Sequence, residues 1–479
     1  MIEFERYSSE TLKKYSPLIS RCPYNVNDIS VGSVYMWNEG VCLAFCEAFG
    51  SFISVQDICE EPSFSYPFGG DDEKATDALI EYVREKDLPL KFYGVTDELL
   101  EKLRNSGRFP KMMFNYDRKW SDYVYDAEEI ATFKGKKFGG QRNHMNKFRS
   151  LYGEPDFRPL EEKDLPAVRK MLADYAKEHP SAGYEENEEY LHTLELIDSF
   201  FGLGLVGGAL FADGKPVSVT VGEVQNDTLI IHVEKALKSY KGVYPTTFNC
   251  FVRYVRDLYP NLKTVNREDD AGDEGLRTSK LQYNPIKLVD KYLVKVNSPL
   301  YGLEKTPVLS HGGVVLSEIT ENDRKAYRKL CTDDQLNLLW GYDYKSDAAI
   351  TGEIDDDTFF DIVKFDRSIG EGISFAVRQN SIDAPLIGEV IVYNFTYNGS
   401  AEIGIRLFRS EQGKGIGSTA YRLASDWAEN ELKVKLKAKC FKENAVSGKM
   451  ILSCGFETDG EDETFYYFNP SRFEFMSAV

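Results

Sequence analysis

The chain has 479 residues, and its 77 Asp and Glu outnumber its 58 Lys and Arg, which gives a net charge of −19. Such an acidic chain disfavours nonspecific binding of the whole body to nucleic acid or to anionic membranes. Its length predicts about two to four domains, and its 42% hydrophobic residues are enough for packed cores.

The first residues, Met1–Arg6, lack the long apolar core of a signal peptide. No apolar run approaches the ~20 residues of a membrane helix. The eight cysteines and five histidines are scattered without metal-type pairs. We therefore expect a cytoplasmic protein with reduced thiols, no membrane contact and no metal site.

Residues 1–118 are predicted to form a first unit of mixed helices and strands. The apolar spacing predicts helices at Ser9–Ile19, Asp72–Lys86 and Asp97–Asn105. Aromatic-rich strands are predicted at Val41–Phe49, Ser51–Val55 and Leu88–Tyr93.

Residues 119–296 repeat this order of elements and are predicted to form a second unit. Helices are expected at Asp164–Glu178, Glu188–Phe200 and Tyr244–Leu258. Strands are expected at Leu205–Ala212, Pro216–Glu223, Thr228–Glu234 and Leu262–Asn266. The first two of these strands form a hairpin that turns at Asp213-Gly214.

A third unit, 298–479, opens with a linker at residues 297–313 and then shows the same order again. A helix is predicted at Glu321–Cys331. Strands are predicted at Ile373–Arg378, Leu386–Phe395, Glu402–Phe408 and Val434–Cys440. The shared order indicates three related tandem units with an α+β fold.

A glycine-rich turn, Gln412–Ser418, follows the predicted strand Glu402–Phe408 and opens a helix. Glycines let such a turn approach a ligand, and the helix start supplies unpaired N–H groups for a phosphate. The turn matches neither the P-loop nor the dinucleotide fingerprint. Ile416, Leu423 and Trp427 have helical spacing after it. A tight turn without a ligand is the alternative interpretation.

These motifs resemble the GNAT N-acyltransferase superfamily. The carrying residues are Gln412, Gly415 and Gly417 after a strand, then Asn444-x-x-Ser447 and a helix that ends at Gly455-Phe456. The resemblance covers residues 312–470 and is closest to the ribosomal-protein-alanine acetyltransferase branch, of which Val315–Asp323 is also typical. It implies three tandem GNAT-like folds, each with a mixed, mostly antiparallel sheet flanked by helices. It also implies acetyl-CoA or another acyl-CoA as co-substrate.

The resemblance implies a cofactor site and a catalytic base in the third unit. The cofactor residues are Ile405, Leu407, Gln412, Gly413, Lys414, Gly415, Ile416, Gly417, Ser418 and Asn444. Glu402 is the first candidate base and Glu389 the second, although each is also explained as a plain acid on a strand edge. Ile451 stands where the family carries its acidic tyrosine. Either Tyr466 or Tyr467 replaces that tyrosine, or the thiolate leaves without help.

The second unit carries a distinctive polar cluster and a basic run. Asn266–Asp270 leads through Gly272 and Gly275 to Leu276–Pro285, and Lys134–Arg149 holds six Lys or Arg without an acid. The pattern resembles an uncharacterised double-GNAT-like family related to the C-terminal domain of phosphatidylglycerol lysyltransferase, over residues 1–296. It implies aminoacyl transfer from charged tRNA and a tRNA contact at 134–149. A solvated helix face is the alternative for the basic run.

Three further details of the second unit leave alternatives open. Lys241–Pro245 has one glycine where a pyrophosphate turn needs two, which disfavours CoA there. His232 and Glu234 face one side of a strand, either as a cleft pair or as a satisfied structural pair. The acids of Glu268–Asp273 lack calcium-loop spacing, so they form helix caps and salt bridges or a cation loop.

The most consistent function is an N-acyltransferase that moves an acyl group from acyl-CoA to a primary amine by direct attack, with its active site in residues 312–470. The acceptor is a small molecule or a protein amine. One alternative is an aminoacyl-tRNA-dependent transferase or an RNA-binding module in residues 120–292. The other alternative is an interaction scaffold without catalysis.

Overall fold

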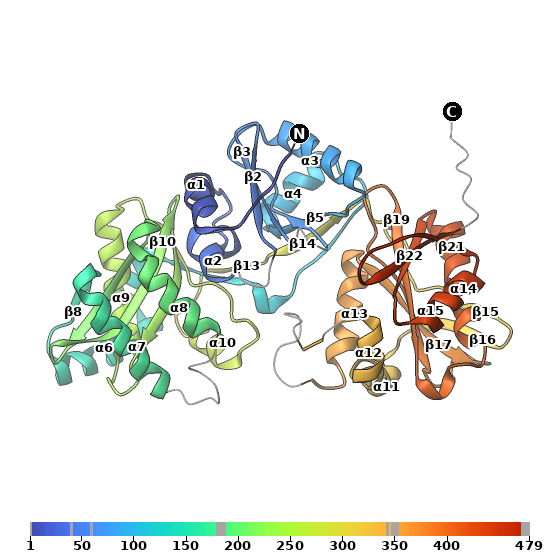
Figure 1. Cartoon of the computed structure of the whole chain (residues 1–479). Helices are drawn as coiled ribbons and strands as arrows, with labels where there is room; N and C mark the ends of the chain where they lie inside the picture. Colours follow the sequence, from blue (N-terminus) through green and yellow to red (C-terminus); the bar gives the residue numbers. More distant parts are fainter. Residues whose placement is uncertain are drawn as a thin grey trace. The chain divides into compact units, whose positions relative to one another are not determined.

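The computed structural model describes residues 2–38, 42–57, 61–178, 188–341, 344–345 and 354–470. Within these ranges the chain is an α+β protein with three mixed sheets of seven, seven and eight strands, flanked by helices (Figure 1). The expected fold class is confirmed. Val41, the expected start of a strand, and residues 471–479 of the expected third unit lie outside the described residues.

The first sheet has the strand order β1-β2-β3-β4-β5-β14-β6. Its strands are β1 (Glu5–Arg6), β2 (Ala44–Ala48), β3 (Ser51–Gln56), β4 (Ser63–Phe64), β5 (Leu90–Val95), β14 (Tyr292–Val296) and β6 (Met112–Asn115). Its helices are α1 (Ser9–Ile19), α2 (Val31–Met36), α3 (Asp72–Lys86) and α4 (Asp97–Asn105). Strand β14 follows the second sheet in the chain, yet it pairs with β6 through Val294 and Phe114. The expected boundary at residue 296 therefore assigns β14 to the wrong sheet.

The second sheet has the order β13-β7-β12-β11-β10-β9-β8. Its strands are β7 (Asp122–Asp126), β8 (Asp156–Pro159), β9 (Val206–Ala212), β10 (Lys215–Gln225), β11 (Thr228–Ala236), β12 (Thr264–Asn266) and β13 (Lys287–Val289). Its longer helices are α6 (Gly139–Tyr152), α7 (Leu165–Glu178), α8 (Glu188–Ser199), α9 (Val243–Leu258) and α10 (Glu274–Leu281). The short helix α5 (Ala127–Thr132) follows β7.

The third sheet has the order β15-β16-β17-β18-β19-β20-β22-β21. Its strands are β15 (Leu309–His311), β16 (Val314–Glu318), β17 (Gly372–Gln379), β18 (Gly388–Tyr393), β19 (Ser400–Leu407), β20 (Lys435–Phe441), β21 (Phe456–Glu461) and β22 (Phe465–Pro470). Its helices are α11 (Arg324–Cys331), α12 (Asp334–Trp340), α13 (Thr358–Ile369), α14 (Ile416–Trp427) and α15 (Ala445–Ser453). The pairs β16 to β19 are antiparallel, whereas β19 and β20 are parallel.

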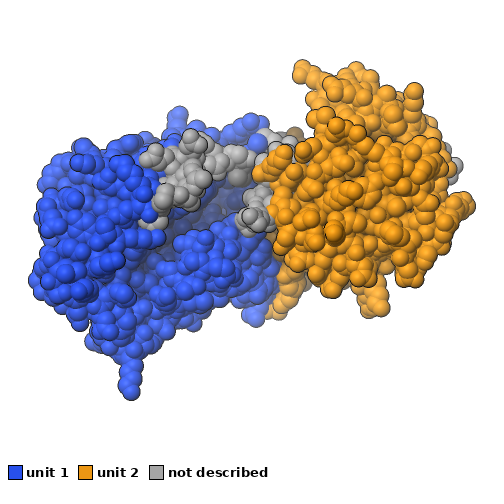
Figure 2. Space-filling view, turned by 90° about the horizontal axis from the view of Figure 1, so that it is seen from below, with its two compact units in different colours: residues 1–79, 92–102, 116–292 blue, residues 80–91, 103–115, 293–479 orange. Residues whose placement is uncertain are grey.

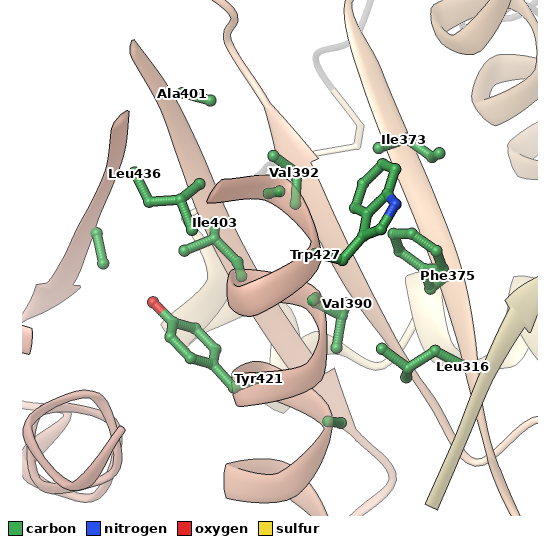
Figure 3. Packing of buried hydrophobic residues seen from close by; sticks show 14 of the residues in the cluster. Leu316, Ile373, Phe375, Val390, Val392, Ala401, Ile403, Tyr421, Trp427 and Leu436 are labelled. Atoms are coloured by element: carbon green, nitrogen blue, oxygen red, sulfur yellow. The ribbon is translucent and has the colours of Figure 1, made fainter. Parts of the chain in front are cut away.

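Helix α14 packs on the third sheet and forms the core below the glycine-rich turn (Figure 3). Its buried residues Ile416, Ala420, Tyr421, Ala424 and Trp427 follow one helical stripe. The Trp427 ring lies 5.3 Å from the Phe375 ring, measured between centroids, in an edge-on arrangement. Burial of each large apolar side chain stabilises the fold by about 1.5–3 kcal/mol. This stripe fixes where the helix, and therefore the turn before it, stands on the sheet.

The contacts divide the chain into two compact units (Figure 2). The first holds residues 1–79, 92–102 and 116–292, and the second holds residues 80–91, 103–115 and 293–479. The boundary between the two units runs through strand β5. The contacts therefore divide the first sheet between the units, although six of its seven strands lie within residues 1–118.

Candidate active site

The glycine-rich turn lies between the end of β19 and the start of α14, as its sequence predicts. Gly413 and Gly415 have φ of +73° and +79°, a left-handed backbone that favours glycine. Gly415 is the N-cap of α14 and supplies no side-chain cap. A Cβ at either glycine would meet no atom within 4 Å, so the space outside the turn is open.

The first turn of α14 offers N–H groups for an anion. The first hydrogen bond within the helix runs from Thr419 N to Gly415 O, at 3.2 Å. The N–H groups of Ile416, Gly417 and Ser418 precede it and have no partner within the helix. The positive end of the helix dipole adds to their attraction for a phosphate. The side chain of Gln412 donates to Leu407 O at 3.0 Å and ties the turn to β19.

Strands β19 and β20 separate beside this turn. Their parallel pairing covers Ser400 to Glu402 and ends there. Lys435 N donates to Gly399 O at 2.8 Å, so the odd-numbered residues of β19 direct their backbone groups toward β20. Phe408 N donates to Ile387 O on the opposite side, which gives the same alternation. The backbones of Ile405 and Leu407 thus face the side where β20 has left the sheet.

Asn444 is the N-cap of helix α15. Its side-chain oxygen accepts a hydrogen bond from Ser447 N at 3.1 Å, and the residue is half-buried. Capping uses the oxygen of the amide and leaves its NH₂ group for a further acceptor. The contact with a pantetheine arm stays a prediction.

Glu402 lies at the point where the two strands separate. Its carboxylate accepts hydrogen bonds from Tyr393 Oη and Asn394 Nδ2, both at 3.0 Å. Lys439 Nζ lies 3.2 Å from the same carboxylate, whose side chain is 19% exposed. Three donors therefore hold a carboxylate that solvent still reaches. Its role as the base stays a prediction that this geometry permits.

Glu389 has a different environment. Its side chain is 1% exposed, and Arg406 Nη2 lies 2.7 Å from its Oε2. Tyr327 Oη donates to its Oε1 at 2.7 Å. Burial and the nearby Glu389 carboxylate raise the pKa of Tyr327 well above its usual value. Both candidate acids have partners on both oxygens, but Glu389 is also closed off from solvent, and this burial argues against its use as a base.

Ile451 is buried, so the position of the family's acidic tyrosine is part of the core. Tyr467 Oη donates to Asp462 at 2.6 Å, and this hydrogen bond, with burial and the charge of Asp462, raises the pKa of Tyr467 to about 12. Tyr466 lies beside it on β22 and is 37% exposed. The raised pKa keeps Tyr467 protonated at neutral pH but makes it a weaker proton donor than an ordinary tyrosine.

The partners of Glu389 and the position of Trp340 could not be predicted from the sequence. Glu402, Gly404 and Arg406 share one face of β19 because side chains alternate along a strand. A Cβ on Gly404 would lie 2.9 Å from the Trp340 ring, and the Arg406 guanidinium lies 4.8 Å from the ring centroid. The alternation of Glu402, Gly404 and Arg406 in the sequence indicates that they share one face of a strand. It does not indicate which residues pack against that face.

The corresponding turn in the second sheet is closed by the protein itself. Gly242 has φ of +83° and is the N-cap of α9. A Cβ at Gly242 would lie 2.1 Å from His144 O, because helix α6 packs against this position. Helix α6 thus packs directly against the glycine at the start of α9, whereas the glycine at the start of α14 is open.

His232 on β11 lies between two carboxylates. Its Nε2 lies 2.9 Å from Glu223 Oε1 and its Nδ1 lies 2.9 Å from Glu268 Oε1. Burial alone lowers the pKa of His232, but the hydrogen bonds to both carboxylates raise it to about 9. Glu234 pairs instead with Arg267, at 2.7 Å. His232 and Glu234 therefore have structural partners, as one of the two interpretations expects.

The stability of this unit is expected to depend on the charge of His232. The folded pKa of about 9 exceeds the ordinary 6.5, so the stabilisation is complete below pH 6.5 and is lost as the pH rises through 9. The loss amounts to roughly 3 kcal/mol. Urea unfolding between pH 6.5 and 9.5 measures this loss of stability. The control variant His311→Gln replaces an exposed histidine and keeps His232, so it should lose the same stability as the parent protein. A His232 ring that titrates near 6.5 in NMR spectra would contradict the assignment.

The acids of Glu268–Asp273 form ion pairs and a helix cap. Asp273 caps α10 by accepting from Leu276 N at 2.6 Å. Asp270 pairs with Arg277 at 2.9 Å, and Asp269 with Lys291 at 3.2 Å. Within the described ranges, no three His, Cys, Asp or Glu side chains gather as ligands for a metal ion.

The basic run Lys134–Arg149 covers a short 3-10 turn and most of helix α6. Lys134, Lys136 and Lys147 are exposed. Arg142 instead donates to the carbonyl oxygens of Phe133 and Gly135. The tRNA contact stays a prediction.

None of the described helices combines the length and the apolar composition needed to cross a bilayer.

Two family models match the chain. The first is described as phosphatidylglycerol lysyltransferase, C-terminal, and covers residues 23–295. The second is described as acetyltransferase (GNAT) domain and covers residues 314–457.

Similar proteins were found among solved structures and curated sequences. A conserved protein of unknown function from Bacteroides thetaiotaomicron is 26% identical, with a TM-score of 0.55 over 62% of this chain and 100% of that chain. The L-PGS structure from Bacillus licheniformis is 14% identical, with a TM-score of 0.45 over 62% of this chain and 94% of that chain. The uncharacterized protein MYCGA3080 of Mycoplasmoides gallisepticum is 26% identical over 179 residues, which are 37% of this chain and 56% of the relative. The chain thus matches little more than half the length of this curated relative.

The family assignment follows from coverage. The lysyltransferase model spans more than half of the chain and includes the polar cluster, the closed turn and the basic helix of the second sheet. The GNAT model spans the glycine-rich turn, the separated strands and both candidate glutamates. A GNAT domain supports, in general terms, acyl transfer from CoA. The chain belongs to the phosphatidylglycerol lysyltransferase C-terminal family and carries a GNAT acetyltransferase domain after it.

Proposed function

We propose that the C-terminal domain is an N-acyltransferase that moves an acetyl or other acyl group from acyl-CoA to a primary amine. The observation that carries this proposal is the separation of β19 from β20 after Glu402, directly beside the open turn Gly413–Gly415. The backbone groups of β19 that no longer pair with β20 therefore lie beside the start of helix α14. The acceptor amine belongs to a small molecule or to a protein.

The residues around these backbone groups fit the parts of an acyl-CoA. The N–H groups of Ile416 to Ser418 suit the pyrophosphate, because they combine unpaired donors with the helix dipole. The backbones of Ile405 and Leu407 suit the amides of the pantetheine arm, as a sheet edge suits an added strand. When bound, acyl-CoA supplies a thioester whose C–S bond breaks as the amine nitrogen forms its bond to the carbonyl carbon.

Glu402 is the candidate base for this reaction. An amine attacks only after it loses the proton of its ammonium form, and a carboxylate within reach of water accepts that proton. The partial exposure of Glu402 permits this route, whereas the burial of Glu389 does not. The backbone N–H of Leu407 faces the separated strands and is suited to polarise the carbonyl. The departing thiolate takes a proton from solvent or from a tyrosine of β22.

Replacement of Glu402 by glutamine tests this function. With acetyl-CoA and a panel of a polyamine, an aminoglycoside and a peptide with a free N-terminus, amine-dependent release of CoA thiol is expected from the parent protein. The variant keeps the size of the side chain but loses the base, so kcat should fall roughly a hundredfold while CoA affinity stays the same. The exposed Glu457→Gln is the matched control. Release of CoA thiol at the same rate with and without an amine would refute the proposed activity. Equal kcat for the parent and Glu402→Gln would show that Glu402 is not the base.

A further inference from the structure

A pocket of about 420 Å³ lies in the second compact unit, away from the glycine-rich turn. Four segments that are distant in the sequence contribute to its wall. The lining residues are Arg84, Arg108, Pro110, Lys111, Val296, Asn297, Tyr397 and Asn398. They come from the end of α3, the segment before β6, the end of β14 and the connection between β18 and β19.

The wall of this pocket is positively charged although the whole chain carries −19. Three of its residues are cations, and none of its described lining residues is an acid. Arg84 and Lys111 have no carboxylate within ion-pair distance in the part of the chain that the structure describes. Cations gathered in a concave site attract an anion more strongly than the same cations on a flat surface, because low-dielectric walls focus the field.

Several contacts fix the wall in place. The Arg84 guanidinium lies 5.1 Å from the centroid of the Tyr397 ring. Asn398 Nδ2 donates to Arg84 O at 2.7 Å, and Asn297 Nδ2 donates to Tyr397 O at 2.9 Å. Stacking on an aromatic ring uses the flat face of a guanidinium and leaves the N–H donors along its edge for an oxyanion.

The pocket is separate from the proposed acyl-CoA site. Tyr397 and Asn398 precede β19, whereas the glycine-rich turn follows it. The eight residues of β19 lie between them, and a strand of that length spans about 25 Å. The two sites therefore stand at opposite ends of one strand.

We propose that this pocket binds a small phosphorylated molecule. Its volume falls within the range of small-molecule sites, roughly 300–1,000 Å³. A guanidinium held against Tyr397 and a neighbouring ammonium match the charge and the hydrogen-bond acceptors of a phosphate. A nucleic-acid backbone is followed by a basic groove that extends over several nucleotides. Pro110 and Val296 instead contribute apolar surface to a single concave site.

The experiment compares Arg84→Gln/Lys111→Gln with a control that removes two positive charges elsewhere in the same domain. Lys325→Gln/Lys329→Gln is such a control, since both lysines are exposed on α11 and distant from the pocket wall in sequence. Inorganic tripolyphosphate is titrated into each full-length protein by calorimetry. The turn at α14 is identical in all three proteins, so a difference in tripolyphosphate binding between them reports the pocket. CoA affinity itself, measured separately, reports that the domain is folded.

The parent and the control are expected to bind tripolyphosphate equally, and the pocket variant roughly ten- to a hundredfold more weakly, because two charge-assisted contacts are lost. A 12-nucleotide oligoribonucleotide is titrated in parallel. Equal binding of tripolyphosphate by all three proteins would overturn the proposal. It would also be overturned if the pocket variant weakened only oligoribonucleotide binding. The parent's CoA affinity is measured in the same series, so failure of the acyl-CoA proposal is seen separately.

Discussion

Gly415→Glu is expected to lower the affinity for CoA roughly a thousandfold. The left-handed backbone of Gly415, at φ +79°, costs a side-chain-bearing residue about 1–2 kcal/mol. The new carboxylate also stands at the start of α14, where like-charge repulsion with a phosphate at about 4 Å reaches about 4 kcal/mol near a protein surface. Calorimetry or native mass spectrometry with CoA measures the change.

Gly302→Glu is the matched control for this prediction. Gly302 has φ of +83° in the connection between β14 and β15, and a Cβ there meets no atom within 4 Å. It imposes the same kind of backbone strain and the same charge on the same compact unit, but more than a hundred residues before the turn in sequence. CoA affinity should be unchanged in this control. If Gly415→Glu binds CoA as the parent does, the turn is not the pyrophosphate site.

Glu389→Ala is expected to destabilise the C-terminal domain by about 3–5 kcal/mol, because it leaves the Arg406 charge buried without its partner. Arg406 is 8% exposed at its side chain, and Glu389 is its ion-pair partner. Burial alone lowers the pKa of Arg406, but attraction to Glu389 outweighs it and keeps the guanidinium charged. Urea unfolding followed by circular dichroism measures the loss.

A double variant separates this structural role from a catalytic one. Glu389→Leu/Arg406→Met removes both charges and leaves apolar side chains of similar size, so most of the lost stability should return. Glu389→Ala with parental stability and a large fall in kcat would show instead that Glu389 acts in the reaction. The Tyr327 hydroxyl loses an acceptor in both variants and does not distinguish them.

Most of the long elements were predictable because their signals are local. The bounds of α1, α3 and α4 agree with the sequence prediction to the residue. The turn Gln412–Ser418 was equally clear, since a strand, the spaced glycines Gly415 and Gly417 and a helical stripe follow one another within about thirty residues. Such patterns depend on neighbours in the chain, and the sequence contains them completely.

The sequence did not predict features that depend on pairing or packing between distant segments of the chain. Strand β14 has an ordinary strand pattern, and nothing in its residues indicates that it joins β6 rather than the second sheet. Glu389 and Glu402 both stand on strands of alternating residues, yet Arg406 and Tyr327 bury one of them and leave the other in reach of solvent. Which acid is buried depends on the helices that cover each face, and these lie far away in the chain.

The sequence by itself determined the strand, the glycine turn and the helix of the candidate CoA site, and it located the six-cation run in an acidic chain. Only the tertiary structure decided that β19 and β20 separate after Glu402, that α6 closes the turn at Gly242, and that three cations gather in one pocket. The reason is physical. Backbone conformation and amphipathic periodicity depend on residues a few positions apart, whereas strand separation, closure and pockets depend on packing between segments separated by tens to hundreds of residues.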